Sequence, residues 1–246
     1  MSIILFDVDG TICESGKKIT IEMVCKINDL IYKNNKVGIV GGGTFEKILF
    51  QLDELIYPHY IFSECGSVYH ILNSDKTYSL VNKNNIRDEP EYIKINTLIK
   101  VCLDFLSKVD YTLSGHFIDL RSGLIYVSLV GMVATEEERV KFIKLDIINN
   151  YREKLLDLLN TKSTELGLNN YIDICLGGSV GIAIYPKKWN KTQVLHYLDT
   201  NNTEIHFFGD KYLPNGNDYE LISHPLIKPH CVDSPEHTLA ELIKFF

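Results

Sequence analysis

Short apolar runs alternate with amphipathic segments in the first part of the chain. Residues Ser2–Phe6 form an apolar run that predicts a buried parallel strand. Residues 21–33 carry apolar side chains at helical spacing directly after Thr20, a typical N-cap residue, and therefore predict a helix. A second strand is expected at Lys36–Val40, where Gly41-Gly42-Gly43-Thr44 ends it and a further helix begins. This order of elements indicates the start of a parallel α/β sheet.

The pattern changes after about residue 82, where a hairpin and longer helices replace the strand–helix alternation. A helix is predicted at Glu89–Leu106, and a hairpin is predicted around the turn dipeptide Ser122-Gly123. Thr135–Glu138 has the spacing of a capping box, so another helix is expected to begin near its end. A helix at Tyr151–Leu159 and two strands flanking Gly177-Gly178 complete the segment. Helices and hairpins without strand–helix–strand order favour an α+β module.

The strand–helix alternation returns from about residue 187. A helix capped by Asn190, a strand at Glu204–Phe208 and a last helix from Ser234 to Phe245 are predicted in this part. We therefore predict an α/β protein with a discontinuous parallel-sheet core at residues 1–82 and 187–246. An inserted α+β domain is expected at residues 83–186.

Composition narrows the possible partners. The chain has 246 residues, 45% of them hydrophobic and 23% charged, which is typical of a globular protein. Lys and Arg total 25 and Asp and Glu total 32, a net charge of −7 without a basic stripe, so we expect no nucleic-acid partner. No apolar stretch approaches the roughly 20 residues of a membrane span. The six cysteines form no Cys-x-x-Cys pair and no signal peptide is evident, so we expect a cytoplasmic protein with reduced thiols and no membrane contact.

Acidic side chains follow two of the predicted strands. Asp7 and Asp9 come directly after the first strand, and Gly10 permits a tight turn, although an isolated Asp-x-Asp-Gly is equally typical of a simple turn. Asp210 likewise follows an apolar strand, and Asp218 comes shortly after it. Because the carboxyl ends of parallel strands meet at one edge, these carboxylates would repel one another without a cation. Mg²⁺ suits such oxygen ligands, and one carboxylate could then attack phosphorus while a neighbour transfers a proton.

The sequence resembles a known family. Asp7-Val8-Asp9-Gly10-Thr11 resembles the first motif of the haloacid dehalogenase superfamily of phosphotransferases. Other blocks, in the same order and over nearly the whole chain, resemble the eukaryotic phosphomannomutase family. These blocks are Val37–Gly42, Phe45–Lys47, Glu64–Gly66, Gly177–Ser179, Tyr185–Lys191, Phe207–Lys211 and Pro214–Glu220. The resemblance implies a Rossmannoid core of haloacid dehalogenase type with a substrate-binding cap domain, and a homodimer that forms through the cap.

The resemblance also implies individual roles. Asp7 would be the nucleophile that becomes an aspartyl phosphate, Asp9 the general acid and base, and Lys191 the residue that neutralises the phosphoryl oxygens. The implied metal ligands are Asp7, Asp9 through its backbone carbonyl, Asp210 and Asp218. The implied substrate-binding residues are Gly42, Gly43, Thr44, Arg121 and Arg139. Taken without the family, Lys191 is equally typical of a solvated helix residue, and Arg139 of an ordinary partner for nearby glutamates.

The chain departs from the family's pattern around the sugar. Met132 replaces a substrate arginine, and Gly181 and Ala183 replace a serine and an aspartate that contact substrate. Lys17 or Lys18 would have to substitute for an arginine, without its fork geometry. His224 replaces an aspartate of an accessory cation site.

The expected function is that of a phosphomannomutase-like enzyme. The resemblance implies interconversion of mannose 6-phosphate and mannose 1-phosphate, which supplies GDP-mannose, with Mg²⁺ as cofactor and a hexose 1,6-bisphosphate as activator. A sugar-phosphate phosphatase with the same nucleophile is the nearest alternative. A catalytically weak sugar-phosphate-binding protein is the alternative from a different class, against which the intact carboxylates and Lys191 argue.

Overall fold

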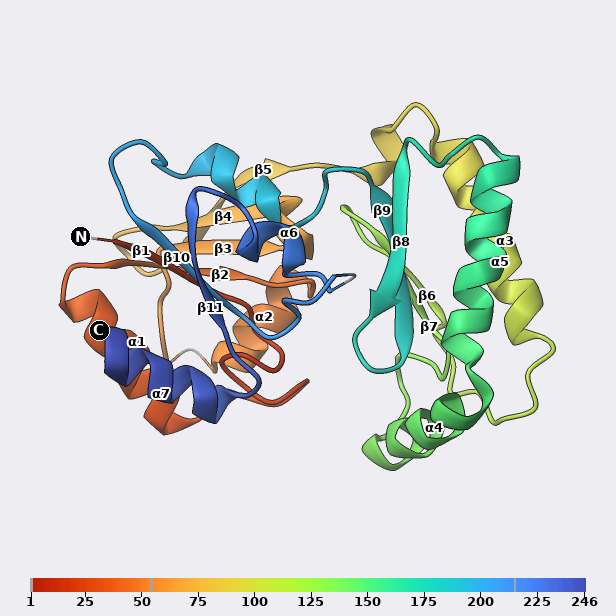
Figure 1. Cartoon of the computed structure of the whole chain (residues 1–246), viewed down its shortest axis with the longest axis horizontal. Coiled ribbons are helices and arrows are strands. Elements are labelled where there is room, and N and C mark those ends of the chain that lie inside the picture. The colour runs from red at the N-terminus through yellow and green to blue at the C-terminus, as the bar shows by residue number, and fades with distance from the viewer. Residues whose placement is uncertain (1, 54, 215) are drawn as a thin grey trace. The chain divides into compact units, whose positions relative to one another are not determined.

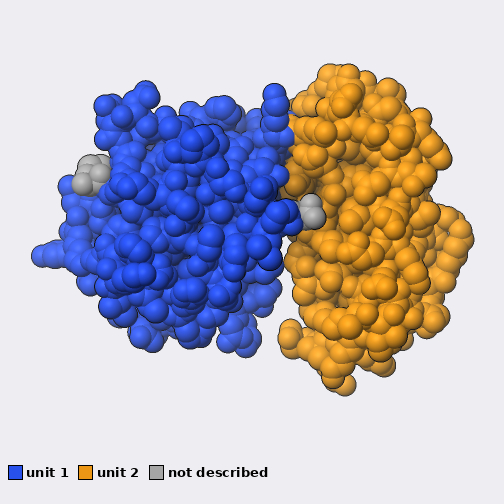
Figure 2. Space-filling view, viewed as in Figure 1, with its two compact units in different colours: residues 1–84, 188–246 blue, residues 85–187 orange. Residues whose placement is uncertain are grey.

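The structure is a computed structural model that describes residues 2–53, 55–214 and 216–246. Asn215, which belongs to the last sequence block above, lies outside the described residues. The chain forms two compact units, residues 1–84 with 188–246 and residues 85–187 (Figure 2). Figure 1 labels the elements of both units.

A seven-stranded sheet in the order β11-β10-β1-β2-β3-β4-β5 forms the centre of the first unit. Its parallel strands are β1 (Ile3–Phe6), β2 (Lys36–Val40), β3 (Tyr60–Ser63), β10 (Ile205–Gly209) and β11 (Ile227–Cys231). The antiparallel strands β4 (Val68–Leu72) and β5 (Tyr78–Lys83) extend the sheet beyond β3. The parallel α/β core predicted from the hydrophobic pattern is confirmed. Strand β5 continues to Lys83, one residue beyond the predicted end of this part of the core.

Apolar side chains on both faces of this sheet are covered by helices. On one face lie α1 (Ile21–Tyr32), α2 (Phe45–Leu52) and α7 (Pro235–Phe245), which contribute to a single apolar cluster with β1, β2 and β10. On the other face lie α6 (Tyr219–Ile222) and the 3-10 helix η3 (Lys191–Tyr197). A further 3-10 turn, η1 (Glu64–Gly66), follows β3. The predicted N-caps Thr20 and Ser234 are confirmed, since each side chain accepts a backbone N–H of its helix.

The helix expected after Asn190 has a different geometry. Asn190 caps it as predicted, and its side chain accepts the Thr192 N–H at 3.0 Å. The helix is of 3-10 type, however, and not an α-helix. Lys191 and Val194 are both fully buried in it. A period of 3.0 residues aligns positions three apart, and in an α-helix the same positions are about 60° apart on one face.

The second unit has a four-stranded antiparallel sheet in the order β6-β7-β9-β8. The strands are β6 (Ile118–Leu120), β7 (Ile125–Ser128), β8 (Ile172–Gly177) and β9 (Gly181–Pro186). The helices are η2 (Ile86–Asp88), α3 (Tyr92–Leu106), α4 (Glu136–Asn149) and α5 (Tyr151–Glu165), of which α5 packs on β8 and β9 and α3 packs on α5. The predicted hairpin and the Thr135–Glu138 capping box are confirmed. Within the described residues, no helix combines the length and apolar character that a membrane crossing needs.

Candidate active site

Three aspartates meet at the carboxyl edge of the seven-stranded sheet. Asp7 follows β1 and Asp210 follows β10, and the two strands are neighbours in the sheet, as the Asp7 N–H to Phe208 carbonyl bond of 2.9 Å shows. Asp218 precedes α6, whose N-terminus lies close to the end of β10. One carboxylate oxygen of each of the three aspartates lies within 4.8 Å of the others. The structure therefore brings together three of the predicted ligands.

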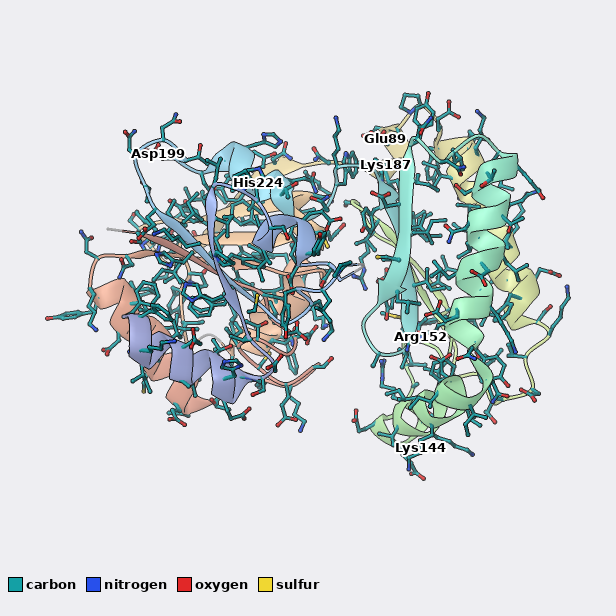
Figure 3. All side chains as sticks on the ribbon, viewed as in Figure 1. Glu89, Lys144, Arg152, Lys187, Asp199 and His224 are labelled. Carbon is teal, nitrogen blue, oxygen red and sulfur yellow. The ribbon has the colours of Figure 1, made fainter. Side chains whose placement is uncertain are left out.

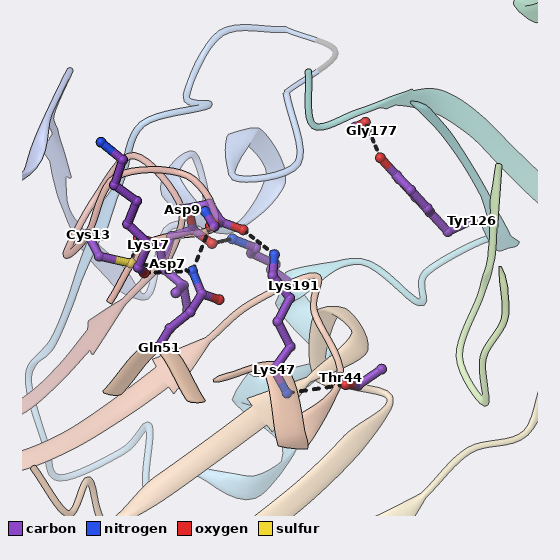
Figure 4. Close-up of polar contacts among 12 residues, drawn as sticks. Asp7, Asp9, Cys13, Lys17, Thr44, Lys47, Gln51, Tyr126, Gly177 and Lys191 are labelled. Carbon is purple, nitrogen blue, oxygen red and sulfur yellow. Dashed lines mark hydrogen bonds and ion pairs between the residues drawn. The ribbon is translucent and has the colours of Figure 1, made fainter. Parts of the chain in front are cut away.

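Lys191 joins two of these carboxylates from within the protein. Its side chain is fully buried, and its Nζ donates to Asp7 Oδ1 (Figure 4). The same Nζ donates to Asp218 Oδ1 at 2.6 Å. The second oxygen of Asp218 accepts the Lys211 N–H at 2.9 Å. Burial alone would lower the pKa of Lys191, but Asp218 and Asp7 outweigh it and raise the pKa, so the lysine stays protonated. The interpretation of Lys191 as a solvated helix residue is thereby wrong.

The cluster contains more carboxylates than cationic side chains that contact them. Burial is the main cause that raises the pKa of Asp7 to about 7, with Lys191 acting against it and Asp218 and Asp210 acting with it. Burial likewise raises the pKa of Asp210, whose Oδ2 accepts from Lys211 Nζ. Among the described residues, Asp210 Oδ1 is buried and has no hydrogen-bond partner. A buried, unpartnered carboxylate oxygen beside two further carboxylates fits the requirements of a divalent metal ion.

Two glycines allow the cluster to form. Gly10 has a φ of +89°, and a Cβ there would lie 2.5 Å from Asp210 Oδ2. A Cβ on Gly209 would lie 2.7 Å from the Cγ of Asp218. Both distances are shorter than any van der Waals contact, so a side chain at either glycine would displace one of the aspartates.

Asp9 points to a different set of partners. Its carboxylate accepts from Lys47 Nζ at 2.7 Å and from Gln51 Nε2 at 2.8 Å (Figure 4). It also accepts the Gly16 N–H at 2.8 Å. Burial would raise the pKa of Asp9, but Lys47 and these hydrogen bonds together lower it. Asp9 is therefore an ionised carboxylate here, the form that accepts a proton. Its side chain does not join the cluster of Asp7, which leaves the backbone carbonyl as the expected metal-binding atom.

The glycine turn after β2 leads directly into α2. Thr44 Oγ1 accepts the Lys47 N–H at 3.3 Å, so this hydroxyl is the N-cap of the helix. The Gly43 carbonyl accepts the Glu64 N–H at 2.9 Å, which ties the turn to η1. A Cβ on Gly42 would have its nearest neighbours at 3.8 Å or more, an ordinary van der Waals distance, so no steric clash requires glycine at this residue. The turn thus presents backbone at a helix N-terminus, a geometry that suits a phosphate group.

The two predicted substrate arginines lie in the second unit. Arg121 donates from Nε to Asp119 Oδ2 at 2.6 Å. Arg139 donates to the backbone carbonyls of Ala134, at 3.1 Å, and Met132, at 3.0 Å. Arg139 thus holds the loop before α4, and the interpretation of it as a partner for nearby glutamates finds no support in these contacts.

The departures from the family's pattern have local structural roles. Gly181 and Ala183 lie on β9, facing β7. His224 follows α6 in the first unit (Figure 3), and its Nδ1 accepts the Leu226 N–H at 3.3 Å. Lys17 and Lys18 pair with Glu14 and Asp53 at the surface.

Sequence reasoning missed several residues that contact the predicted site. Lys47 and Gln51 hold Asp9, Lys211 contacts Asp210, and Tyr126 lies beside Arg121. Lys47 and Gln51 occupy one side of α2, at a spacing of four residues, and could have been found from that spacing. Their partner lies 38 residues away from Lys47 in the sequence, so only the folded sheet places the two together.

This combination of fold and site defines a class of protein. A parallel α/β sheet with an aspartate at the end of its central strand, a second aspartate two residues later and a buried lysine is the arrangement of a phosphotransferase of haloacid dehalogenase type. The sequence profile of the eukaryotic phosphomannomutase family matches residues 24–246. The chain therefore belongs to the eukaryotic phosphomannomutase family.

Individual relatives agree with this assignment. The chain is 36% identical over 239 residues to a phosphomannomutase of Dendrobium officinale, which covers 96% of this chain and 90% of the relative. It is 35% identical over 247 residues to a phosphomannomutase of Glycine max, covering 99% and 96% of the two chains.

Solved structures share the fold at much lower identity. A truncated, IMP-bound IMP-nucleotidase of Plasmodium falciparum has a TM-score of 0.67 at 16% identity, covering 99% of this chain and 67% of that chain. A trehalose-6-phosphate phosphatase of Aspergillus fumigatus has a TM-score of 0.55 at 13% identity, covering 98% and 91%. At these identities the likeness shows the fold alone.

Proposed function

We propose that this protein is a phosphomannomutase that interconverts mannose 6-phosphate and mannose 1-phosphate through an aspartyl phosphate on Asp7. The observation that carries the proposal is the contact of the buried Asp7 carboxylate with Lys191, beside Asp210 and Asp218, in a chain of this family. A carboxylate with a raised pKa at the end of a central strand is a suitable nucleophile, because its burial weakens its solvation.

The proposed reaction has two balanced transfers. An oxygen of Asp7 attacks one phosphorus of a hexose 1,6-bisphosphate, and the bond from that phosphorus to the sugar oxygen breaks. Asp9 donates to the leaving oxygen a proton that it has taken from solvent in the first turnover and from the second transfer in later ones. In the second transfer, the free hydroxyl of a hexose monophosphate attacks the aspartyl phosphate, Asp9 takes up the hydroxyl proton, and Asp7 is released. Lys191 neutralises charge on the transferring phosphoryl group throughout.

We expect Mg²⁺ at the acidic cluster. Asp7, the Asp9 carbonyl and Asp210 would hold it. Asp218, also implied as a ligand by the family resemblance, would support them instead, because its two oxygens accept from Lys191 and from the Lys211 N–H. The unpartnered Asp210 Oδ1 supports this assignment. When bound, the ion supplies Lewis-acid stabilisation of the phosphoryl oxygens.

Residues 85–187 are the proposed substrate-binding cap, and residues 1–84 with 188–246 are the proposed catalytic core. In this proposal Arg121 and Arg139 bind the sugar phosphate, since a guanidinium group suits bidentate phosphate recognition. Gly42, Gly43 and Thr44 bind the phosphoryl group at the N-terminus of α2.

We further propose a cytoplasmic homodimer that forms through the second unit. All six cysteines are free thiols, which is typical of a reducing compartment. Ile147 and Ile148 on α4 are 74% and 76% exposed and offer an apolar surface to a second copy.

A sugar-phosphate phosphatase is the second candidate. Met132, Gly181 and Ala183 have no side-chain hydrogen bonds to offer a sugar, and a weaker hold on the sugar would let water compete for the aspartyl phosphate.

One experiment separates the two candidates. Purified protein is supplied with Mg²⁺ and mannose 1-phosphate, with and without a hexose 1,6-bisphosphate, and both mannose 6-phosphate and free phosphate are followed. A mutase forms mannose 6-phosphate at a rate that the bisphosphate increases. Free phosphate as the sole product would instead establish the phosphatase. Asp7→Asn serves as the inactive control, because an amide cannot attack phosphorus.

A further inference from the structure

The sheet of the second unit has one apolar and one polar face. Directly paired residues share a face, so Leu120, Ile125, Ile184 and Ile174 form one row across the four strands. Ile125 and Ile184 in this row are fully buried. The neighbouring row, Asp119, Tyr126, Ala183 and Cys175, lies on the opposite face. Tyr126 is the large side chain at the centre of this second row.

Tyr126 and Asp119 together hold Arg121. The Arg121 Nε donates to Asp119 Oδ2 at 2.6 Å, and its guanidinium carbon lies 5.1 Å from the centre of the Tyr126 ring. The Arg121 side chain is only 10% exposed. One hairpin therefore supplies the arginine, the carboxylate that orients it and the aromatic ring on which it lies.

The same phenol occupies the space beside Gly181. A Cβ on Gly181 would lie 2.4 Å from the Tyr126 hydroxyl oxygen, 2.5 Å from the ring carbon that bears it and 2.6 Å from the backbone carbonyl oxygen of Val127. The hydroxyl donates to the Gly177 carbonyl at 3.1 Å, which fixes the ring across the turn between β8 and β9 (Figure 4). The Tyr126 ring in this position and a side chain at residue 181 therefore exclude each other.

We propose that Tyr126 is a positioning and specificity-determining residue of the sugar-phosphate site, which orients Arg121 through its ring and takes the space of a side chain at residue 181. The inference rests on the proposed function, because it assigns Arg121 to substrate binding. It adds that Tyr126, together with the Val127 carbonyl, leaves no room for a side chain at residue 181. Recognition on this part of the face then depends on the shape of the phenol and the orientation of one arginine, instead of on a polar side chain at 181.

The test measures binding and turnover separately. The dissociation constant of mannose 1-phosphate is measured by isothermal titration calorimetry for the full chain and for Tyr126→Ala, Tyr126→Phe, Gly181→Ala and the double variant Tyr126→Ala/Gly181→Ala. Tyr126→Ala should weaken binding about tenfold, the scale of a partly desolvated cation–π contact, with kcat at saturation within about threefold. Tyr126→Phe keeps the ring and should stay within about threefold of the parent in binding.

The double variant supplies the sharpest test. Gly181→Ala alone should weaken binding at least as much as Tyr126→Ala, because the new Cβ displaces the phenol and also meets the Val127 carbonyl. In the double variant the phenol is already absent and only the contact with the Val127 carbonyl remains, so the loss of binding should be clearly smaller than the product of the two single losses. Multiplied effects of the two single changes, or an unchanged dissociation constant in Tyr126→Ala, would overturn the proposal.

A matched control separates specific from structural effects. The Tyr111 hydroxyl in the same unit also donates to a backbone carbonyl, that of Leu129 at 3.1 Å, so Tyr111→Phe removes an equivalent bond. This variant should lower the Tm and leave binding unchanged. Binding of mannose 1-phosphate without mutase turnover would contradict the proposed function and leave the role of Tyr126 intact. Two results would contradict the role of Tyr126. One is turnover with a dissociation constant that does not change in the Tyr126 variants, and the other is no binding by the parent chain.

Discussion

Asp7 and Asp9 stand two residues apart and have opposite electrostatic environments. Burial, which Lys191 only partly offsets, raises the pKa of Asp7 to about 7, whereas Lys47 lowers the pKa of Asp9. A folded-state pKa above the unfolded value means that the stability from this group is complete below about pH 4 and is lost as the pH rises through about 7. A lowered pKa means that the stability is present above about pH 4 and is lost as the pH falls. The two aspartates should therefore respond to pH in opposite ways.

Asparagine substitutions test this contrast at the scale of single residues. In metal-free protein, Asp7→Asn should raise the Tm at pH 8 by more than at pH 5, because the amide carries no buried charge. Asp9→Asn should lower the Tm at pH 8 and should have a smaller effect near pH 4. Thermal unfolding in a chelator at the three pH values measures both, and a common pH trend for the two variants would show that their environments do not differ.

The loop between β1 and α1 determines whether the carboxylates can meet. It contains two glycines in the left-handed region, Gly10 with a φ of +89° and Gly16 with a φ of +75°. A Cβ on Gly10 would collide with Asp210, while a Cβ on Gly16 has nothing within 4 Å. A substitution at Gly16 therefore tests backbone strain alone, whereas one at Gly10 tests strain together with the collision with Asp210.

Alanine at each glycine should have different consequences for this loop. Gly16→Ala adds strain alone and should cost about 1 kcal/mol of stability without changing metal affinity. Gly10→Ala should cost more and should also weaken the apparent affinity for Mg²⁺ about tenfold or more, because Asp210 has to move. Denaturant unfolding and metal titrations measure the two effects, and equal metal affinity in both variants would contradict this assignment.

The acidic cluster exists only in the complete fold, since β1, β10 and the start of α6 each contribute one carboxylate. A metal ion that binds the folded chain but not the unfolded chain stabilises the fold by RT ln(1 + [L]/Kd). This is about 2.7 kcal/mol when the free metal concentration is a hundred times Kd. Mg²⁺ should therefore raise the Tm of the whole molecule, and EDTA should remove both this increase and the activity. Asp210→Ala should abolish most of the shift. If EDTA changed neither the Tm nor the activity, a metal ion at this cluster would be excluded.

The proposed dimer has its own test at the scale of the whole molecule. Ile147→Lys combined with Ile148→Lys should convert a dimer to a monomer, because two desolvated lysines disfavour an apolar interface. Ile243→Lys on α7, 69% exposed in the first unit, is the matched control and should leave the assembly unchanged. Sedimentation velocity distinguishes the two states. A monomeric parent chain would contradict the dimer directly.

The sequence by itself determined the elements whose signals are local. Hydrophobic period, N-caps such as Thr20 and Ser234, and the Thr135–Glu138 capping box act within a few residues, so they predicted α1, α4, α7 and the parallel strands β1, β2 and β10. The antiparallel strands β4 and β5 were not predicted from the sequence. Strand β5 lies at the edge of the sheet with mostly exposed side chains, and it has no clear apolar period. The 3-10 geometry of η3 was likewise not predicted, since no local pattern in the sequence distinguishes it from an α-helix.

The candidate site likewise contains residues that the sequence predicted and contacts that only the tertiary structure shows. Asp7, Asp9 and Asp210 were predicted from their places after apolar strands, because parallel strands align their carboxyl ends whatever the rest of the chain does. Only the tertiary structure decided that Lys191 lies buried between Asp7 and Asp218, that Lys47 holds Asp9, and that Tyr126 takes the space beside Gly181. These contacts join residues dozens of positions apart, and charge pairing or steric exclusion over such separations depends on three-dimensional distance, which no local pattern in the sequence encodes.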